Sequence, residues 1–366
     1  MKSTASTLIH LAHMNPAIEV VDSLLRGVGQ VMFQNNPIAG LLFLVGIFIN
    51  SSEYGLSALL GLVVATLAAY LLGADRPLIR NGLFGFNGVL TGIALSVFLQ
   101  WNWHLAVYIV LGAIVSTIVM VGLAKLLITW DIAPLTAPFV LTAWLLLFAL
   151  YQFGQLHPTK LIGPMAVHPG AAIQTDLQEA AGGAGAVGLT AANLANAFFR
   201  GVGEVFLQDN LWTGVVFAIA ILVSSRVCFG FALLGSALGG LTALVLGGDG
   251  VTIYHGLYGF NAVLTAIALG GRPDGLACPR RFLVPNWWST IYAFIGAIFS
   301  AIVFAAIAVA LSPLGMPALT APFVLTTWVF LVPTADFRAL QRVSVAECAS
   351  TKSLVALPTP KSTRAE

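Results

Sequence analysis

Long apolar stretches separated by short polar segments run along the chain from about residue 28 to residue 333. A bilayer crossing takes about 20 predominantly apolar residues, and five stretches in each half approach that length. We expect crossings at 28–50, 55–73, 82–99, 104–128 and 134–153, and again at 204–224, 229–247, 256–270, 286–311 and 318–333. The pattern predicts an all-α polytopic membrane protein.

The two halves repeat one another. A shift of 174 residues places GLFGFNGVLTGIAL, at 82–95, on GLYGFNAVLTAIAL, at 256–269, with 11 of 14 positions identical. The string LTAPFVLTAW, at 135–144, returns as LTAPFVLTTW at 319–328. Since five crossings per copy is an odd number, the second copy must enter the membrane in the opposite orientation, which makes the pair an inverted-topology repeat.

Composition and charge agree with a membrane protein. The chain is 58% hydrophobic and only 8% charged, too few charges to cover a soluble globule. Basic residues collect in short cytoplasmic loops; Arg76 and Arg80 follow the second crossing, whereas the matching loop at 247–255 has no Lys or Arg. We therefore expect a multi-pass protein of the cell (inner) membrane with both termini in the cytoplasm, although Lys160 and Arg200 do not fit this orientation.

The repeat and the composition divide the chain into four parts. We expect a first repeat with its N-terminal segment at 1–154, a linker at 155–192, the inverted second repeat at 193–335 and a cytoplasmic tail at 336–366. The linker is rich in Gly and Ala, which is typical of a flexible joint. The three cysteines lie far apart without metal-ligand spacing, so no metal or other cofactor is expected.

Each copy carries a threonine two residues before a proline, as Thr136 and Thr320. Pro138 has no N–H and is expected to leave the carbonyl of Pro134 without its helical partner, which interrupts the helix. Irregular backbone is tolerated in a bilayer only where it is buried in protein or lines a polar cavity. A threonine beside a proline often bonds back to its own helix, but its repetition in both copies favours a place on a transport path.

Gln30 and Glu204 are equivalent residues, each following Gly-Val-Gly. A carboxylate inside a membrane is costly, which makes Glu204 a functional candidate, unless it belongs to a short external segment before a crossing. A proton-coupled carrier would use Glu204 as a titrating group. The neutral Gln30 in the other copy indicates that the shared task is hydrogen bonding, which favours passive conduction.

Aromatic and apolar side chains accompany these polar groups. Phe86 and Phe260 stand beside glycines that permit close backbone approach and are followed by an asparagine in both copies. Phe33 and Leu207 lie three residues after the paired Gln and Glu, and therefore on the same helical face if the helix continues. An aromatic in an apolar stretch is usually core or lipid-facing; the exact duplication favours a pore lining.

Together, Gly-Val-Gly-Gln-Val-Met-Phe-Gln-Asn-Asn-Pro and the duplicated Gly-Phe-Asn-x-Val-Leu and Leu-Thr-Ala-Pro-Phe resemble the urea transporter family over about 27–333. The signature LPxxTxPF of that family is met at 316–323 except for Met316 in the first position. In the first copy the upstream proline, Pro134, lies one position late.

The resemblance implies a homotrimer in membrane lipid, with one pore per protomer between the two halves, that conducts urea and small amides passively. Two slots bounded by phenylalanines would flank a narrow filter. The resemblance assigns Phe33, Phe86, Leu207 and Phe260 to the slots, and to the filter the side chains of Gln30, Glu204, Thr136 and Thr320 with the backbone carbonyls of Leu90 and Leu264. Stacked acceptor oxygens would replace the water around the four N–H donors of urea, whereas an ion would remain poorly compensated.

Other classes fit less well. We find neither HExxH nor GxSxG, so we do not expect an enzyme. The aquaporin-like string Asn15-Pro16-Ala17 is not repeated, because the second copy has Leu189-Thr190-Ala191 there. The remaining alternatives are a proton-coupled urea or amide carrier that uses Glu204 and, more remotely, an ammonium channel. That channel would need histidines deep in its pore, whereas the six histidines here lie outside the apolar stretches or at their ends.

Overall fold

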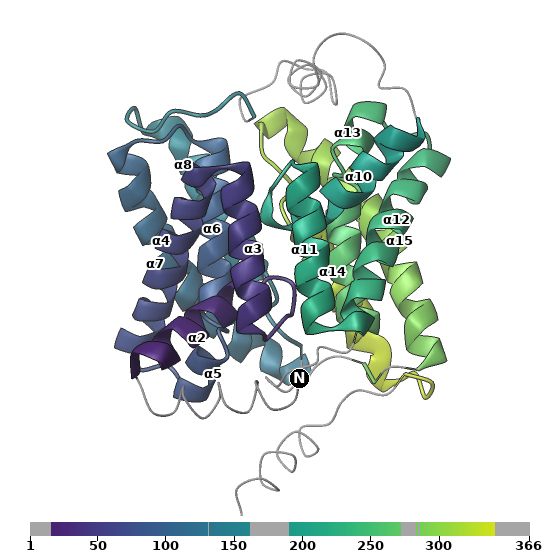
Figure 1. Ribbon diagram of the computed structural model, residues 1–366, viewed down its shortest axis with the longest axis horizontal. Coiled ribbons are helices and arrows are strands. Elements are labelled where there is room, and N and C mark those ends of the chain that lie inside the picture. The colour runs from purple at the N-terminus through teal and green to yellow at the C-terminus, as the bar shows by residue number, and fades with distance from the viewer. Residues whose placement is uncertain (1–15, 131, 162–189, 272–282, 285, 341–366) are drawn as a thin grey trace, which may run out of the picture.

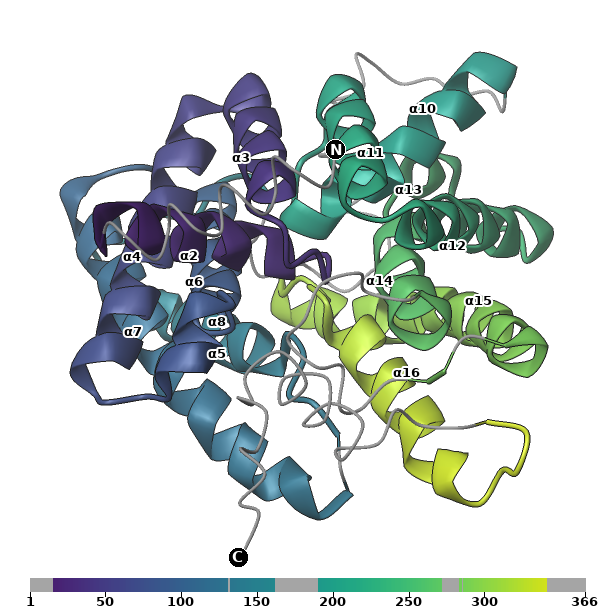
Figure 2. The same cartoon turned by 60° about the horizontal axis from the view of Figure 1, so that its bottom comes forward.

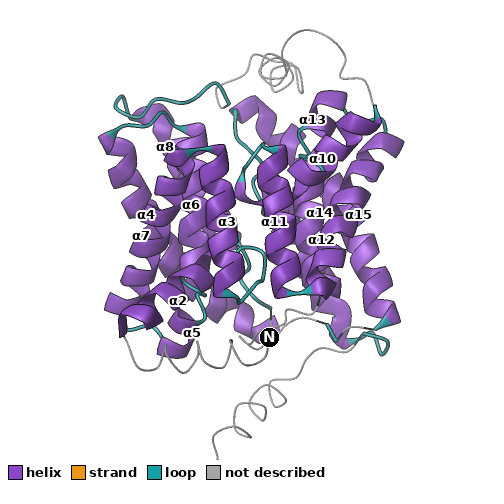
Figure 3. Cartoon of the chain, in the orientation of Figure 1, coloured by secondary structure: helices purple, strands orange, loops and turns teal. Residues whose placement is uncertain are grey.

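In the computed structural model of the 366-residue chain, the described residues are 16–130, 132–161, 190–271, 283–284 and 286–340. Every regular element in this part of the chain is a helix, beside one isolated bridge between Leu99 and Pro158 (Figure 3). The helices of the two halves form two bundles that stand side by side in both views (Figures 1 and 2). The predicted all-α class is confirmed.

The two bundles contain matching elements. The first has α2 Pro16–Gln30, α3 Pro37–Asn50, α4 Ser52–Leu71, α5 Arg76–Arg80, α6 Gly85–Phe98, α7 Trp103–Leu126 and α8 Ala137–Ala149. The second has α10 Ala191–Gly203, α11 Leu211–Ser224, α12 Arg226–Val245, α13 Gly250–Tyr254, α14 Gly259–Gly270, α15 Trp287–Leu311 and α16 Ala321–Leu331. In Figure 1, α2 and α5 lie at the lower end and α10 and α13 at the upper end, the placement that an inverted repeat requires.

Four helices among the described residues are long and apolar enough to cross a membrane by themselves. They include α4, α12 and the two longest helices, α7 and α15, each extended by a short 3-10 turn. The helices at 191–206 and 211–224 pass the same test only as a pair bent by 73°, the form of a broken span or of a re-entrant loop. The other apolar helices are shorter; the 14 residues of α6 rise about 21 Å, less than the roughly 30 Å of a hydrocarbon core.

The expected crossings at 28–50 and 204–224 are both interrupted. The first helix ends at Gln30, and a new helix begins only at Pro37. The side chain of Asn36 accepts hydrogen bonds from the N–H groups of Ile38 and Ala39, which defines this new start. Asn210 does the same for α11. Each break contains three consecutive polar residues, at 34–36 and 208–210, which the search for apolar stretches passed over.

The prolines of the repeated motif start helices and do not kink them. Pro138 and Pro322 occupy the first turns of α8 and α16, where a missing N–H costs nothing. The carbonyl of Pro134 has no helical partner four residues on, as expected, but it accepts a hydrogen bond from the N–H of Ala137 at 3.1 Å. The irregular backbone therefore precedes each proline.

Some elements and segments were outside the sequence predictions. The apolar stretches did not reveal α5, α13, most of α2 or α10, because these helices are short or amphipathic. The first linker residues are ordered: the N–H of Gln100 donates to the carbonyl of His157 at 2.8 Å. Parts of the sequence predictions lie outside the described residues. These parts are residues 162–189 of the linker predicted at 155–192, the tail from 341 onwards, Cys278 and Cys348.

Small residues let the helices of each bundle approach closely. A methyl group on Gly61 of α4 would lie 2.1 Å from the carbonyl oxygen of Gly88 on α6. Across the two bundles, α3 and α11 lie side by side, and the hydroxyl of Thr213 donates to the carbonyl of Gly46 at 2.9 Å. Such small-residue contacts replace the hydrophobic driving force that lipid does not supply.

Candidate functional site

The two predicted filter threonines meet where the bundles face each other. Thr136 and Thr320 precede α8 and α16, and their Oγ1 atoms lie 2.7 Å apart, within hydrogen-bond distance. Each residue is only 3% exposed. The structure thus brings together two residues that come from equivalent positions of the two copies.

A pair of asparagines leaves these hydroxyls available. Neither threonine side chain caps its own helix. The N–H of Phe139 in the first turn of α8 donates instead to Oδ1 of Asn87, on α6, at 3.2 Å. The N–H of Phe323 donates to Asn261 at 3.0 Å in the other copy. The asparagines therefore act as positioning residues, which sequence analysis missed although both follow Gly-Phe in the duplicated motif.

Two tryptophans tie the copies together. Nε1 of Trp144 donates to the carbonyl of Pro317, and Nε1 of Trp328 donates to the carbonyl of Ala133, both at 2.9 Å. Each bond runs from one copy to the irregular segment before the threonine of the other copy. The duplicated string ends in these tryptophans, which was the signal that sequence analysis did not use.

Four large residues adopt left-handed backbone conformations in equivalent pairs. The φ angles are 61° at Phe33 and 57° at Leu207, and 55° at Leu135 and 50° at Leu319. For such residues this conformation costs about 1–2 kcal/mol, and strained backbone of this kind clusters at functional sites. The expected helical face shared with Gln30 and Glu204 is therefore wrong for Phe33 and Leu207, because each lies beyond the end of its helix.

The predicted slot residues precede the threonine in the chain order of each copy. The ring of Phe33 contacts the ring of Phe323, from the opposite copy, edge-on with centroids 6.0 Å apart. Leu207 is half-buried. Phe86 and Phe260 lie buried in the first turns of α6 and α14, and Phe260 also packs edge-on against Phe304.

Leu90 and Leu264 lie one helical turn after these phenylalanines. Both side chains are fully buried in the core, so only their backbone carbonyls are candidates for facing a solute. The spacing of four residues places each carbonyl on the helical face of the preceding phenylalanine. This is compatible with the role that the resemblance assigns.

Gln30 and Glu204 occupy the ends of equivalent segments but have different surroundings. Nε2 of Gln30 donates to the carbonyl of Asn81 at 2.8 Å, which fixes the amide and leaves Oε1 as the acceptor. Glu204 is 7% exposed. None of the ion pairs among the described residues includes its carboxylate.

The comparison with known proteins decides the family. The sequence model described as "Urea transporter" matches residues 21–335. The chain belongs to the urea transporter family. It is similar to "Urea transporter 1" of Ovis aries, with 33% identity over 321 residues that cover 87% of this chain and 78% of the relative. It is 32% identical over 333 residues to "Urea transporter 1" of Mus musculus, covering 90% and 81%.

Membership of the urea transporter family confirms the resemblance inferred from the motifs. It also confirms that the chain is not an enzyme, since this family transports its substrate. Among the described residues of this urea transporter family member, no group of three or more His, Cys, Asp or Glu side chains could hold a metal ion. The candidate site thus consists of neutral oxygens, one carboxylate and apolar rings.

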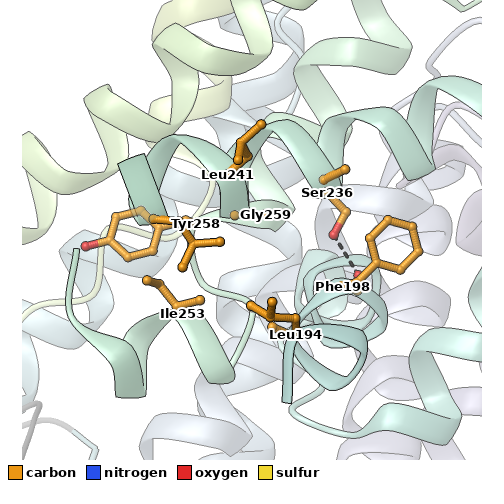
Figure 4. Close-up of a pocket in the computed structure, with 12 residues that line it drawn as sticks. Leu194, Phe198, Ser236, Leu241, Ile253, Tyr258 and Gly259 are labelled. Atoms are coloured by element: carbon orange, nitrogen blue, oxygen red, sulfur yellow. Dashed lines mark hydrogen bonds between the residues drawn. The ribbon is translucent and has the colours of Figure 1, made fainter. Parts of the chain in front are cut away.

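A cavity of about 180 Å³ lies apart from these residues, between α10, α12 and the start of α14 (Figure 4). Ser236 borders it and donates a hydrogen bond to the carbonyl of Phe198 at 2.6 Å. The first copy has Leu62 at the position of Ser236, and there the leucine packs between Gly27 and Gly85. The smaller side chain explains why the second copy keeps a space that the first fills.

Proposed function

We propose that this chain conducts urea passively, down its gradient, through a path between its two bundles. The observation that carries the proposal is the contact between the hydroxyls of Thr136 and Thr320 at the junction of the copies. Equivalent residues that touch each other must lie beside the pseudo-two-fold axis, where a path between the halves has to pass. Membership of the urea transporter family supports the choice of solute.

The chemistry suits a small amide. Urea has four N–H donors and one carbonyl, and each buried donor without a partner costs about 1–3 kcal/mol. Acceptors are available on Oε1 of Gln30, the carboxylate of Glu204 and the two hydroxyls, with the carbonyls of Leu90 and Leu264 beside them. A ladder of such acceptors replaces the solvation shell in steps.

The threonine pair imposes a geometric condition. Oxygens 2.7 Å apart leave no room for a solute between them, so urea passes alongside the pair. The mutual bond uses one of the two hydroxyl hydrogens, which leaves the other to donate to the urea carbonyl. The remaining lone pairs accept from its N–H groups.

Ring edges restrict the shape of what enters. Phe33, Phe86 and Phe260, with Leu207 in place of a fourth ring, would form apolar slots on either side of the oxygens. A flat neutral solute loses little solvation free energy in such a slot, whereas a hydrated ion loses much more and finds no charge pair to compensate for it. The neutral Gln30 argues against obligatory proton coupling, and neither the carrier nor the ammonium alternative is favoured.

Location and assembly are part of the proposal. We infer a cell-membrane protein with cytoplasmic termini, organised as repeats 1–154 and 193–335 with a linker and a tail, and assembled as a homotrimer with one pore per protomer. The basic residues Arg76 and Arg80 support this orientation. They begin and end α5, which lies at the lower end in Figure 1, whereas α10 lies at the upper end. Native mass spectrometry in detergent tests the trimer; a monomer that transports urea contradicts it.

Stopped-flow urea efflux from proteoliposomes tests the conduction itself. We expect fast flux for the wild type and a strong loss in Thr136→Val, which keeps the shape but removes the hydroxyl. Thr242→Val is the matched control, because the hydroxyl of Thr242 bonds back within α12 to Leu238. Wild-type flux no faster than that of empty liposomes would refute urea conduction.

A further inference from the structure

The two ends of the proposed path are held by equivalent networks of different chemistry. Behind Gln30 in the first copy stand Arg26, Asn35 and Asn81; we call them the amide network. At a shift of 174 residues the second copy has Arg200, Asp209 and His255 behind Glu204; we call them the ionisable network. Each neutral amide of the first copy is thus replaced by a group that can exchange a proton.

The amide network holds its loop without a titratable contact to it. Nη1 of Arg26 donates to the carbonyl and to Oδ1 of Asn35, at 2.8 and 3.0 Å. Nδ2 of Asn35 donates to Oδ1 of Asn81 at 3.1 Å. The charge of Arg26 is balanced one turn away on its own helix, by Asp22 at 2.6 Å.

In the ionisable network the carboxylate that balances the arginine lies on the loop before α11 and not on the helix of the arginine. The second copy has Asn196 in place of Asp22, and Nη1 of Arg200 donates to Oδ1 of Asp209 at 2.7 Å. Nδ1 of His255 lies 2.6 Å from Oδ2 of Asp209. Nη1 of Arg200 also lies 3.2 Å from the same Nδ1, so this ring nitrogen stands between a guanidinium and a carboxylate.

The histidine of the ionisable network is buried, whereas its aspartate partner reaches solvent. His255 is 3% exposed, and its buried Nε2 has no hydrogen-bond partner. Asp209 is 41% exposed and gives protons access to the pair. Among the described residues, Arg200 also contacts His255, and the ring of Tyr254 packs edge-on against the imidazole with centroids 5.4 Å apart. Asp249 caps α13 through Thr252.

The ionisable network is connected to two residues assigned to the proposed path, Leu207 and Glu204. Asp209 lies two residues after Leu207, the slot residue in the left-handed conformation, and the carbonyl of Arg200 accepts the N–H of Glu204. A histidinium bond to a carboxylate is about twice as strong as the bond of a neutral imidazole. The charge on His255 therefore sets how firmly the loop that carries Leu207 is held.

We propose that Arg200, Asp209 and His255 are positioning residues for Leu207 and Glu204, and that the charge on His255 changes urea flux through the second-copy mouth. The first-copy mouth, held by amides, does not respond. The proposal rests on the urea path proposed above. Imidazoles in general change charge between about pH 5 and 8, so we expect flux at pH 5.5 and flux at pH 8.0 to differ at least twofold.

The test is urea efflux from proteoliposomes with the same pH on both sides, from 5.5 to 8.0. Asp209→Asn combined with His255→Asn gives the second copy the residues of the first and should retain flux but remove its pH dependence. Adding Asp22→Asn, Asn35→Asp and Asn81→His to that variant grafts the ionisable network onto the first copy and should restore the dependence. A merely structural network would change the rate without changing this profile.

Two results would overturn the proposal. One is wild-type flux that is equal across this pH range. The other is a pH dependence that survives in the Asp209→Asn, His255→Asn variant but disappears in Glu204→Gln, which would assign the proton to Glu204. Absence of urea flux at every pH, in every variant, would refute the proposed function itself, so the two failures are distinguishable.

Discussion

Oγ1 of Thr136 lies 2.7 Å from Oγ1 of Thr320, although 184 positions separate the two residues in the sequence. Because the residues are equivalent, their contact fixes the position of the pseudo-two-fold axis. The pair therefore presents a threonine hydroxyl to a solute that arrives from either side of the membrane, which suits a path that conducts in both directions.

The symmetry predicts equal effects of two different substitutions. Thr136→Val and Thr320→Val should each reduce urea flux about tenfold, as expected for about 1.4 kcal/mol. The double variant should fall by clearly less than the product of the two, because both singles remove the same mutual bond. Stopped-flow light scattering measures all three. Strictly multiplicative losses would show that the hydroxyls act independently.

The asparagine behind each threonine should matter for stability as well as for flux. Asn261→Ala leaves the buried N–H of Phe323 without its acceptor, a loss of about 1–3 kcal/mol. Asn261→Asp keeps the acceptor and should be milder, although it loses the donor to the carbonyl of Leu319. Thermal unfolding in detergent compares the two. Equal melting temperatures for Asn261→Ala and the wild type would remove the positioning role.

Left-handed backbone before the threonine makes the shape of Leu319 more important than its volume. Leu319→Ile keeps the volume but places a β-branched side chain at a φ of 50°, which such residues avoid. We expect a destabilisation of about 1–3 kcal/mol and a reduced flux. Leu325→Ile, on an exposed face of α16, is the control. If both variants unfold at the same temperature, the backbone there is not strained.

The indole N–H groups should contribute equally in the two copies. Trp328→Phe and Trp144→Phe each leave a carbonyl of the other copy, on Ala133 or Pro317, without its donor. Each should cost about 1–2 kcal/mol and loosen the junction of the bundles. Trp212→Phe, at a largely exposed site, should cost little. A larger loss in that control would contradict the assignment.

Much of the site could be predicted from sequence because its motifs occur once in each copy. The duplicated strings identified Thr136 and Thr320, and the equivalence of Gln30 with Glu204 followed from the same shift. The left-handed turns at Phe33 and Leu207 were not predictable, since neither residue type favours that conformation. The break at 31–36 was marked in the sequence by the amides at 34–36 and by Pro37, but the long apolar stretches on either side outweighed that signal. Contacts of Trp144 and Trp328 depend on how whole bundles meet, which no local pattern encodes.

The crossed indole bonds also bear on the symmetry of the junction. Trp144 reaches the second copy and Trp328 reaches the first, by the same bond at the same length. Two separate copies of one half, placed antiparallel, would form the same isologous interface between identical chains. The junction of the halves thus has the symmetry of a homodimer interface, and a single chain needs only a tether to join its two sides.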